Sequence, residues 1–416
     1  MTGKKLNVVG LNCGTSIDGI DVAQLEVSLE QADNAAGFFS LNVKLLHYSE
    51  AQIDPHLKKL VLDTCYPGKS TTIADVCDLN FAIGEAFGNA VLDSGINLDE
   101  VDLISSHGQT VWHEPRGGVR NSTLQLGEPS VISQLTGKTV VSGFRTAEVA
   151  VGRQGAPICG FLESALLHDD AKVIISQNIG GIGNATVIDP KLTFFQFDTG
   201  PGNMMIDTAV KILTDNQKQY DVSGSMANEG ENEIDHEYVE AFLNQPYFGL
   251  SPPKTTGREL FGDNVSERIT KELISKGLSP SGVVATITRI TSESISRAYE
   301  MHVLPQVTNS EIDEIYLCGG GAYNTNLVKN LQKRFPTTKV AKLNERSPVN
   351  AESKEAVAFA ILGYLCITGA YAEIPRFSES EEKTHMGVIT PGKNFNRLFS
   401  WISGLDGMVL KNVIVK

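Results

Sequence analysis

The sequence predicts an α/β protein built from two lobes that share one construction. The chain has 416 residues, which is enough for two domains of ordinary size. Each half opens with an apolar strand, a glycine-rich turn and a second strand, at residues 6–27 and again at 172–188. Each half then continues into longer segments with helical character. These observations indicate an internal duplication of a mixed α/β unit.

Consecutive strands with short connections open both halves, which favours an antiparallel start to each sheet. In the first half, strands are expected at 6–11, 21–27, 41–48 and 101–106, and helices at 56–65 and 73–94. In the second half, strands are expected at 172–177, 185–188, 192–197 and 314–317, and helices at 203–216, 236–244, 281–302, 324–335 and 351–367.

We expect the first lobe to span residues 1–145 and the second to span 146–394. The boundary is placed at a glycine-containing connecting stretch, 140–160. Residues 395–416 are a candidate for completing the first lobe.

The charge balance excludes some classes of partner. The formal net charge is −14, and nucleic acid or an anionic membrane surface requires a positive footprint. No apolar stretch approaches the roughly 20 residues that a membrane helix needs. The six cysteines are scattered, which is typical of free thiols in a reducing compartment, so we expect a cytoplasmic protein. We expect a small-molecule substrate, with a homodimer left open.

The first glycine turn combines groups that suit a phosphate ligand. Glycine permits close backbone approach and positive φ, and the hydroxyls of Thr15 and Ser16 donate further hydrogen bonds. Asp18 places a carboxylate where Mg²⁺ would accompany phosphates. The alternative is a plain β-hairpin turn. The predicted ATP-binding residues here are Gly14, Thr15, Ser16, Ile17, Asp18, Gly19, Ile20 and Asp21.

Two further glycine turns are predicted to contribute to the same ATP site. The turn at 178–184 is the counterpart of the first turn, and two opposed hairpins are able to clamp a triphosphate. The turn at 319–324 follows a strand and precedes a helix, which suits approach to a nucleoside. Its alternative is a helix-entry loop with Asn324 as N-cap. The residues predicted to bind ATP here are Gly180, Gly181, Asn184, Gly319, Gly320, Gly321 and Asn324.

Polar side chains at strand ends supply candidate catalytic and substrate-binding groups. Asp198 follows a strand and precedes a Gly-Pro-Gly bend, so it is a candidate general base, and its alternative is a cap of the next turn or helix. His107 also follows a strand and is either a base, a substrate partner or a structural hydrogen-bonding group. Arg153 and Gln154 lie between glycines, as a sugar or anion site would require. Glu355 is either a surface residue or a placed carboxylate on an Ala-rich helix.

These motifs together resemble the anhydro-N-acetylmuramic acid kinase family, whose relative levoglucosan kinase shares the first pattern. That pattern is G-x-x-x-G-T-S-x-D-G-x-D, from Gly10 to Asp21. The other blocks that resemble the family are, in chain order, 107–110, 153–157, 178–182, 197–203, 254–259 and 319–321. The resemblance covers about residues 6 to 395, and the combination is specific although each block alone is not.

The resemblance implies an actin/hexokinase/Hsp70-like (ASKHA) fold, with two ribonuclease-H-like lobes and ATP in the cleft between them. It also implies a reaction that opens a 1,6-anhydro bridge with water at C1 and transfers the γ-phosphate of ATP to O6. Asp198 matches the family's general base, and Asp18 and Glu355 match its carboxylates around Mg²⁺. The substrate-binding residues predicted are His107, Gln109, Arg145, Arg153 and Gln154.

Two features favour levoglucosan as the substrate, because Arg153 and Ser176-Gln177 look like the levoglucosan kinase branch. A separate departure is Gly143, which stands where family members commonly have Asp before Phe-Arg, so a carboxylate that would contact the substrate or pair with Arg145 is missing. Levoglucosan would give glucose 6-phosphate. The alternative substrate is 1,6-anhydro-N-acetylmuramic acid, giving N-acetylmuramic acid 6-phosphate. Two further alternatives are an actin- or chaperone-like ATPase that acts on a protein partner and a catalytically silent sensor.

Overall fold

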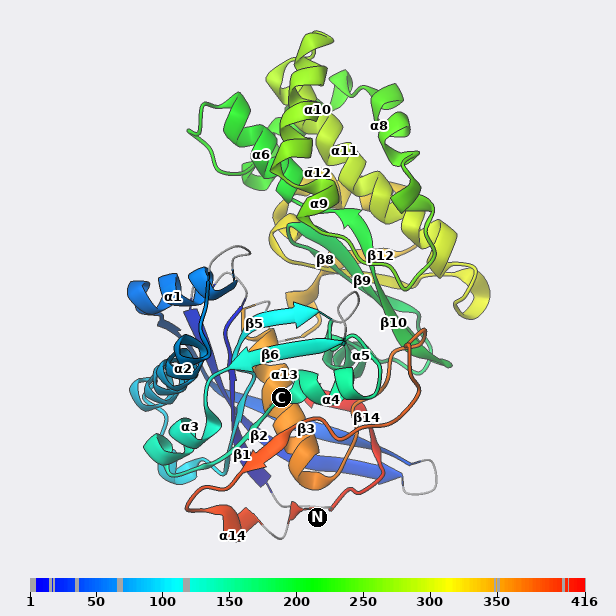
Figure 1. The fold of residues 1–416 in the computed structure, drawn as a ribbon. Coiled ribbons are helices and arrows are strands. Elements are labelled where there is room, and N and C mark those ends of the chain that lie inside the picture. The colour runs from blue at the N-terminus through cyan, green and yellow to red at the C-terminus, as the bar shows by residue number, and fades with distance from the viewer. Residues whose placement is uncertain are drawn as a thin grey trace. The chain divides into compact units, whose positions relative to one another are not determined.

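The computed structural model describes residues 5–415 apart from short gaps, and the described chain forms two units (Figure 1). The gaps are residues 15, 16, 18, 34–36, 66–69, 115–119, 348, 350, 351, 399, 400 and 403. The first unit comprises Met1–Leu166, Pro348–Ile374 and Ser378–Lys416. The second comprises Leu167–Ser347 and Pro375–Phe377.

The first unit contains a seven-stranded sheet in the order β13-β7-β4-β1-β2-β3-β14. Its first three strands form an antiparallel meander, and β4 and β7 then add in parallel beside β1. A separate two-stranded ribbon pairs β5 with β6. The strands are β1 Lys5–Asn12, β2 Gly19–Asp33, β3 Phe38–Gln52, β4 Leu103–Ser106, β5 Gln109–Glu114, β6 Ser122–Leu126, β7 Thr139–Ser142, β13 Val388–Thr390 and β14 Val409–Val415.

The second unit repeats this pattern in a five-stranded sheet, β10-β9-β8-β11-β12. Again three strands form an antiparallel meander, and two strands add in parallel beside the first. The strands are β8 Ile174–Ile179, β9 Ile182–Asp189, β10 Leu192–Pro201, β11 Glu314–Cys318 and β12 Lys339–Lys342. The same strand order in both units confirms the predicted α/β fold of the actin/hexokinase/Hsp70 type, with two ribonuclease-H-like lobes.

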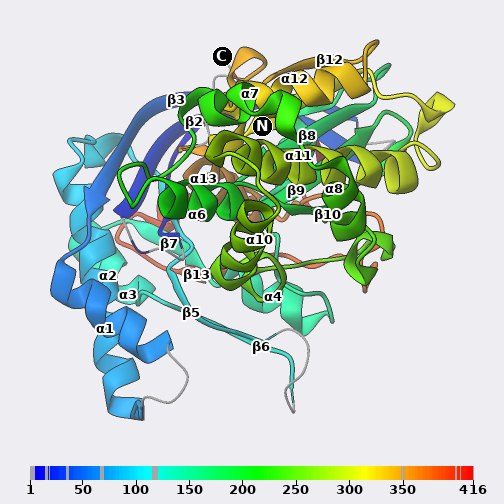
Figure 2. The ribbon, with the colours of Figure 1, turned by 90° about the horizontal axis from the view of Figure 1, so that it is seen from above.

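Helices cover the sheets of both units. Figure 2 shows α1, α2 and α3 gathered along one side of the first unit. Hydroxyl residues cap two of the long helices: Thr72 forms a capping box with Asp75 before α2, and Ser279 caps α11 ahead of Pro280. The helices of the first unit are α1 Pro55–Cys65, α2 Ile73–Asp93, α3 Pro129–Thr136, α4 Phe144–Ala150, α5 Gly160–Leu167, α13 Lys354–Thr368 and α14 Phe395–Leu398. Those of the second unit are α6 Met204–Leu213, α7 Ser225–Glu229, α8 His236–Leu243, α9 Arg258–Phe261, α10 Asp263–Ser275, α11 Pro280–Ala298 and α12 Thr325–Arg334.

The observed division differs from the predicted boundary at 145/146. The first unit extends to Leu166, and α13, which was expected in the second lobe, belongs to the first. The physical reason is pairing over long distances in the chain, because β13 pairs with β7 and β14 pairs with β3. Residues near the C-terminus therefore complete the first sheet.

Helix α13 packs directly on β1, and Gly10 makes this close approach possible. A Cβ at Gly10 would lie 1.9 Å from the carbonyl oxygen of Ala356 and 2.9 Å from the Cβ of Ala360. The Ala-rich stretch of the helix therefore meets a strand position that has no side chain. In this structure Gly10 serves helix–strand packing.

We expect Gly10→Ala to destabilise the protein by about 3 kcal/mol or more, because backbone in both elements would have to shift. Thermal and chemical unfolding would measure the loss. Gly249→Ala is the matched control, since a Cβ there meets nothing within 4 Å. Equal stability of the two variants would contradict the packing role of Gly10.

The described residues contain no helix that is long and apolar enough to cross a membrane. The structure joins none of the six cysteines in a disulfide bond within its described residues.

Candidate active site

In the first unit, Glu355 lies at the end of β1 beside the first glycine turn. Asn12, the last residue of β1, donates from Nδ2 to Glu355 Oε2 at 2.6 Å. Glu355 is in the first turn of α13, whose start is fixed by a 2.6 Å ion pair between Lys354 and Glu163. The structure thus brings together the predicted phosphate turn and a predicted metal ligand, although they are more than 330 residues apart in the chain.

The backbone of the glycine turn differs from the prediction. Among the described residues of the turn, Ile17 has a positive φ, at 55°, and its N–H donates to the carbonyl of Gly14 at 3.1 Å. Gly19 does not adopt positive φ, and a Cβ there would lie 2.3 Å from Glu50 Oε1. Glycine at position 19 therefore accommodates the Glu50 side chain. Three predicted residues, Thr15, Ser16 and Asp18, lie outside the described residues.

Negative charge is concentrated at this edge of the first sheet. Tyr48 donates from its hydroxyl to Asp21 Oδ1 at 2.7 Å. Burial raises the pKa of Asp21, and the charges of Glu50 and Glu355 raise it further, against the opposing hydrogen bonds from Tyr48 and Asn12. Carboxylates that repel one another in this way fit a divalent cation. The described residues alone do not form a set of three metal ligands.

His107 holds Arg145 in place and has both ring nitrogens engaged. Arg145 donates from Nε to His107 Nε2 at 2.8 Å, so the proton is on Nδ1, which contacts the carbonyl oxygen of Gly108 at 2.8 Å. Burial, with a smaller contribution from Arg145, lowers the pKa of His107 to about 3. The ring stacks on Phe359 at 4.4 Å. In this geometry His107 is a neutral positioning residue, and neither nitrogen is available as a base or as a sugar contact.

Arg145 is fixed without a carboxylate at position 143. Its NH1 donates to the carbonyl oxygen of Gly155 at 2.7 Å, in addition to the bond to His107. Gly143 instead caps the start of α4 in the left-handed region, with φ of 72°. The Asp that family members commonly carry there is therefore not needed to orient Arg145 in this chain.

A cavity of about 350 Å³ in the first unit is lined in part by His107, Gly108 and Gly143, and Gln109 follows Gly108 in the chain without lining the cavity. The Gln109 side chain is buried and donates from Nε2 to the carbonyl oxygen of Thr110 at 3.2 Å. Its Oε1 is buried without a hydrogen-bond partner. The role of Gln109 in substrate binding stays a prediction.

Arg153 and Gln154 contact protein groups. Arg153 is buried and forms two hydrogen bonds to Glu148, at 2.8 and 2.6 Å. Its NH1 donates to the carbonyl oxygens of Ser380 and Glu382. Gln154 Nε2 bonds to Glu379. These contacts tie residues 379–382 to the end of α4, so the guanidinium predicted to bind sugar is occupied by the protein itself.

We expect Arg153→Met to destabilise the protein by about 3 kcal/mol, because it leaves a partly buried Glu148 carboxylate without its partner. The KM for sugar should change little. Unfolding curves and steady-state kinetics would check both statements.

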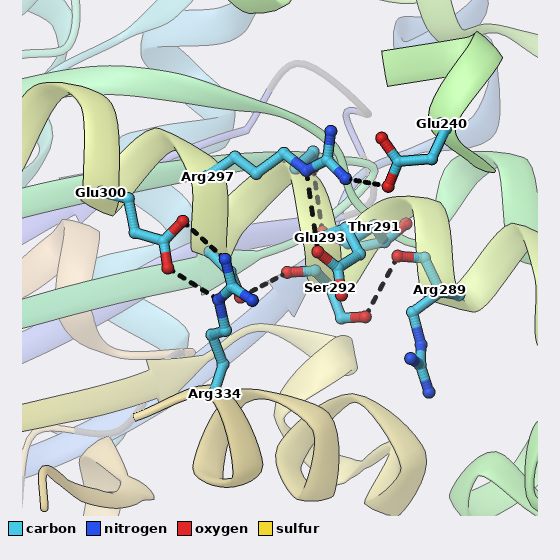
Figure 3. Close-up of polar contacts among 10 residues, drawn as sticks. Glu240, Arg289, Thr291, Ser292, Glu293, Arg297, Glu300 and Arg334 are labelled. Atoms are coloured by element: carbon cyan, nitrogen blue, oxygen red, sulfur yellow. Dashed lines mark hydrogen bonds and ion pairs between the residues drawn. The ribbon is translucent and has the colours of Figure 1, made fainter. Parts of the chain in front are cut away.

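The control is Arg334→Met, which removes an exposed pair to Glu300 (Figure 3). An exposed pair contributes about 1 kcal/mol at most. Figure 3 also shows Arg297 with Glu240 and Glu293, so this surface of the second unit carries several such pairs. A large rise in KM with unchanged stability in Arg153→Met would contradict the structural assignment.

In the second unit, Asp198 is held by the segment that precedes α9. The strand β10 continues through Asp198, with a register shift between Asp198 and Gly200. Thr256 N–H donates to Asp198 Oδ2 at 2.8 Å, and Asp198 N–H donates to the carbonyl oxygen of Lys254 at 3.0 Å. Tyr247 donates from its hydroxyl to the Asp198 carbonyl oxygen at 2.7 Å. Asp198 therefore binds a loop 58 residues further along the chain and does not serve as a side-chain cap of α6.

Three glycine segments of the second unit meet at the carboxyl end of β8. Asn203 N–H donates to the carbonyl oxygen of Gly180 at 2.7 Å, and Gly202 N–H to that of Gly181 at 3.0 Å. A Cβ at Gly321 would lie 2.2 Å from Ile179 Cγ2. The predicted turns around 180 and 320 thus lie together.

A cavity of about 390 Å³ lies beside these turns, and Gly320 and Asn324 line it. Its other lining residues are Asn203, Ile206, Asp207, Tyr220, Asp221, Ser223 and Tyr323. Burial raises the pKa of Asp207 to about 6. Asn324 also caps α12 by accepting from Asn326 N–H and Leu327 N–H. The predicted helix cap at Asn324 is confirmed, and its contact with a nucleoside stays a prediction.

Sequence reasoning did not assign a role to Asn12, Tyr247, Lys254 or Thr256. The block 254–259 stood out as polar, but periodicity cannot separate substrate contact from surface in a loop. The position of this block after Pro252-Pro253 gave no indication that it forms hydrogen bonds with Asp198 on β10. Only the tertiary structure brings Lys254 and Thr256 to Asp198.

The duplicated unit, with glycine turns and carboxylates at strand ends, is the construction of two-lobed kinases and ATPases. Residues 6–392 match the family described as anhydro-N-acetylmuramic acid kinase. A protein of that description from Caldanaerobacter subterraneus subsp. tengcongensis is 37% identical over 396 residues, covering 92% of this chain and 96% of the relative. Another from Bacillus cereus (strain Q1) is 36% identical, covering 92% and 98%. The chain therefore belongs to the anhydro-N-acetylmuramic acid kinase family.

Solved structures match only distantly. A ROK family glucokinase from Streptomyces griseus, solved with glucose and AMPPNP, has a TM-score of 0.32 and 11% identity, covering 86% of this chain and 99% of that one. These values are too low to support a conclusion about this chain.

Proposed function

We propose that the protein is an ATP-dependent kinase of 1,6-anhydro-N-acetylmuramic acid that opens the 1,6-anhydro bridge while phosphorylating O6. The observation that carries the proposal is the position of the Asp198 carboxylate. Asp198 lies on β10 beside the second glycine turn, and the Thr256 N–H orients its carboxylate. The names of the family and of its relatives support this substrate.

The proposed reaction balances with one base. Water adds to C1, the C1–O6 bond breaks, O6 takes the γ-phosphoryl group, and ADP leaves. One proton of the water is released, and Asp198 accepts it first. A hydrogen bond donated to a carboxylate favours its charged form. The Thr256 N–H therefore orients the Asp198 carboxylate and favours the form that can accept a proton.

The glycine turns and the cavity of the second unit are the proposed nucleotide groups. Gly320 and Asn324 would contact the nucleoside, and Gly180 and Gly181 would approach the phosphates with their backbone. In the first unit, Glu355 and Asp18 would hold Mg²⁺, which when bound neutralises charge on the transferring phosphoryl group.

The choice of sugar substrate depends on which side chains are free of protein contacts and able to bind the sugar. The features that favoured levoglucosan include Arg153 and Gln177, and both of these side chains bind protein groups. Gln177 accepts from the Tyr299 hydroxyl at 2.7 Å and is fully buried. Neither is in a position to distinguish two sugars, so the amino sugar named by the relatives is the preferred substrate.

The test is a coupled assay with Mg-ATP and, separately, 1,6-anhydro-N-acetylmuramic acid, levoglucosan and glucose. We expect sugar-dependent ADP release that is fastest with the first compound. In H₂¹⁸O, the label should appear at C1 of the product and not in its phosphate. Faster turnover of levoglucosan would overturn the substrate, unlabelled product would overturn the coupled opening, and ADP release that no sugar accelerates would overturn the kinase.

A further inference from the structure

Lys254 places a buried ammonium group beside the candidate base. The residue is 6% exposed, and its carbonyl oxygen accepts from the Asp198 N–H. Lys254 and Asp198 also interact through their side-chain charges. A lysine is rarely buried to this degree without a compensating partner, because removing its charge from water is costly.

Tyr247 holds both members of the pair. The Lys254 ammonium lies 4.8 Å from the centroid of the Tyr247 ring, a cation–π contact, while the Tyr247 hydroxyl bonds to the Asp198 carbonyl oxygen. The ammonium also reaches the carbonyl oxygens of Tyr247 and Phe248, each at 3.5 Å. Hydrogen bonds of this length are weak, so they stabilise the ammonium little. The negative charge of Asp198 also favours the charged form of Lys254.

Another titratable group that Lys254 influences is the imidazole of His302. His302 lies in the π-helical turn after α11, Tyr299–Val303, and its ring packs edge-on to Phe197. Burial, followed by the charge of Lys254, lowers the pKa of His302. Its Nε2 is buried without a hydrogen-bond partner. His302 therefore does not compete with Lys254 as a second cation near Asp198.

We propose that Lys254 is a positioning residue that keeps Asp198 ionised and aligned for proton abstraction. The inference rests on the proposed function for its kinetic consequence, but the charge coupling between the two side chains is independent of it. Among the described side chains, Lys254 interacts with Asp198 on β10, with Tyr247 in the turn that precedes Lys254, and with His302 on the π-helical turn.

The charge state of Lys254 agrees with this role. Burial lowers its pKa to about 8, and the charge of Asp198 acts in the opposite direction and raises it. The ammonium is therefore the main form of Lys254 below about pH 8, which includes neutral pH. Removing it should make Asp198 easier to protonate.

The kinetic test compares Lys254→Met and Lys254→Arg. In Lys254→Met we expect the acid limb of the kcat/KM profile to move to higher pH by about one unit, with little change in KM for ATP. Lys254→Arg should restore the limb. The control is Lys276→Met. The Lys276 ammonium also lies over a tyrosine ring, 5.2 Å from the centroid of Tyr238, but it forms an ion pair with Asp235 and not with Asp198. An acid limb that does not move in Lys254→Met would overturn the proposal.

A second measurement does not depend on activity or on the folding of the lysine variants. In protein labelled with ¹³C at lysine Cε, the Lys254 signal should titrate near pH 8 and at a lower pH in Asp198→Asn, because a negative charge that favours the ammonium is gone. An unchanged Lys254 titration in Asp198→Asn would overturn the coupling. If no anhydrosugar is phosphorylated while the titration does shift, the proposed function fails and the charge coupling stands.

Discussion

Asp198→Asn is expected to lower kcat by about 10²–10⁴-fold while the protein stays folded. Asparagine has the same shape and can still accept the Thr256 N–H through its side-chain oxygen, so the local structure should persist. What it cannot do is accept the proton of the attacking water. The measurement is sugar-dependent ADP release at saturating substrate, together with the melting temperature.

The matched control for this variant is Asp189→Asn. Asp189 is a buried carboxylate at the far end of the β9–β10 hairpin, where it accepts from Thr308 N–H at 2.6 Å and from Thr308 Oγ1 at 3.0 Å. Its loss should lower the melting temperature and leave turnover per folded molecule nearly unchanged. An Asp198→Asn enzyme that keeps more than a tenth of the original kcat would remove Asp198 from the role of base.

Local pattern was sufficient for the framework of both sheets. Apolar runs separated by glycine turns predicted the β1–β2 and β8–β9 hairpins, because residues that pair across a tight turn are close in sequence. The assignment of α13 to a lobe could not be obtained this way. Its neighbour is Gly10, more than 340 residues away, and nothing in the Ala-rich sequence of the helix specifies that strand.

The candidate site was predictable where chemistry coincides with a strand end and not where it depends on what a side chain faces. Asp198 stands out in the sequence because a carboxylate follows a strand and precedes a Gly-Pro-Gly bend. Arg153 and His107 have the residue types of ligand contacts, but the structure directs them to Glu148 and Arg145. Lys254 lies in a loop without periodicity, and only its burial against the Tyr247 ring reveals it.

Glu355→Gln is expected to lower kcat by about 10²-fold and to raise the Mg²⁺ concentration needed for half-maximal rate. Glutamine can still accept the Asn12 amide, so the end of β1 and the start of α13 should keep their geometry. The variant removes one negative charge from a group that also includes Asp21 and Glu50. If Mg²⁺ is what these carboxylates hold, its apparent affinity must fall with their charge.

A partly buried glutamate of the same unit, Glu373, separates this effect from a general loss of charge. Glu373 accepts from the Ser164 hydroxyl at 3.2 Å, and burial raises its pKa. Glu373→Gln therefore removes a carboxyl group of the first unit that is not among the proposed metal ligands. Its Mg²⁺ dependence should match that of the original protein. If Glu355→Gln behaves in the same way, with unchanged kcat and Mg²⁺ requirement, the carboxylates beside β1 do not hold the metal. The bond from Asn12 to Glu355 would then serve only to anchor α13 on the first sheet.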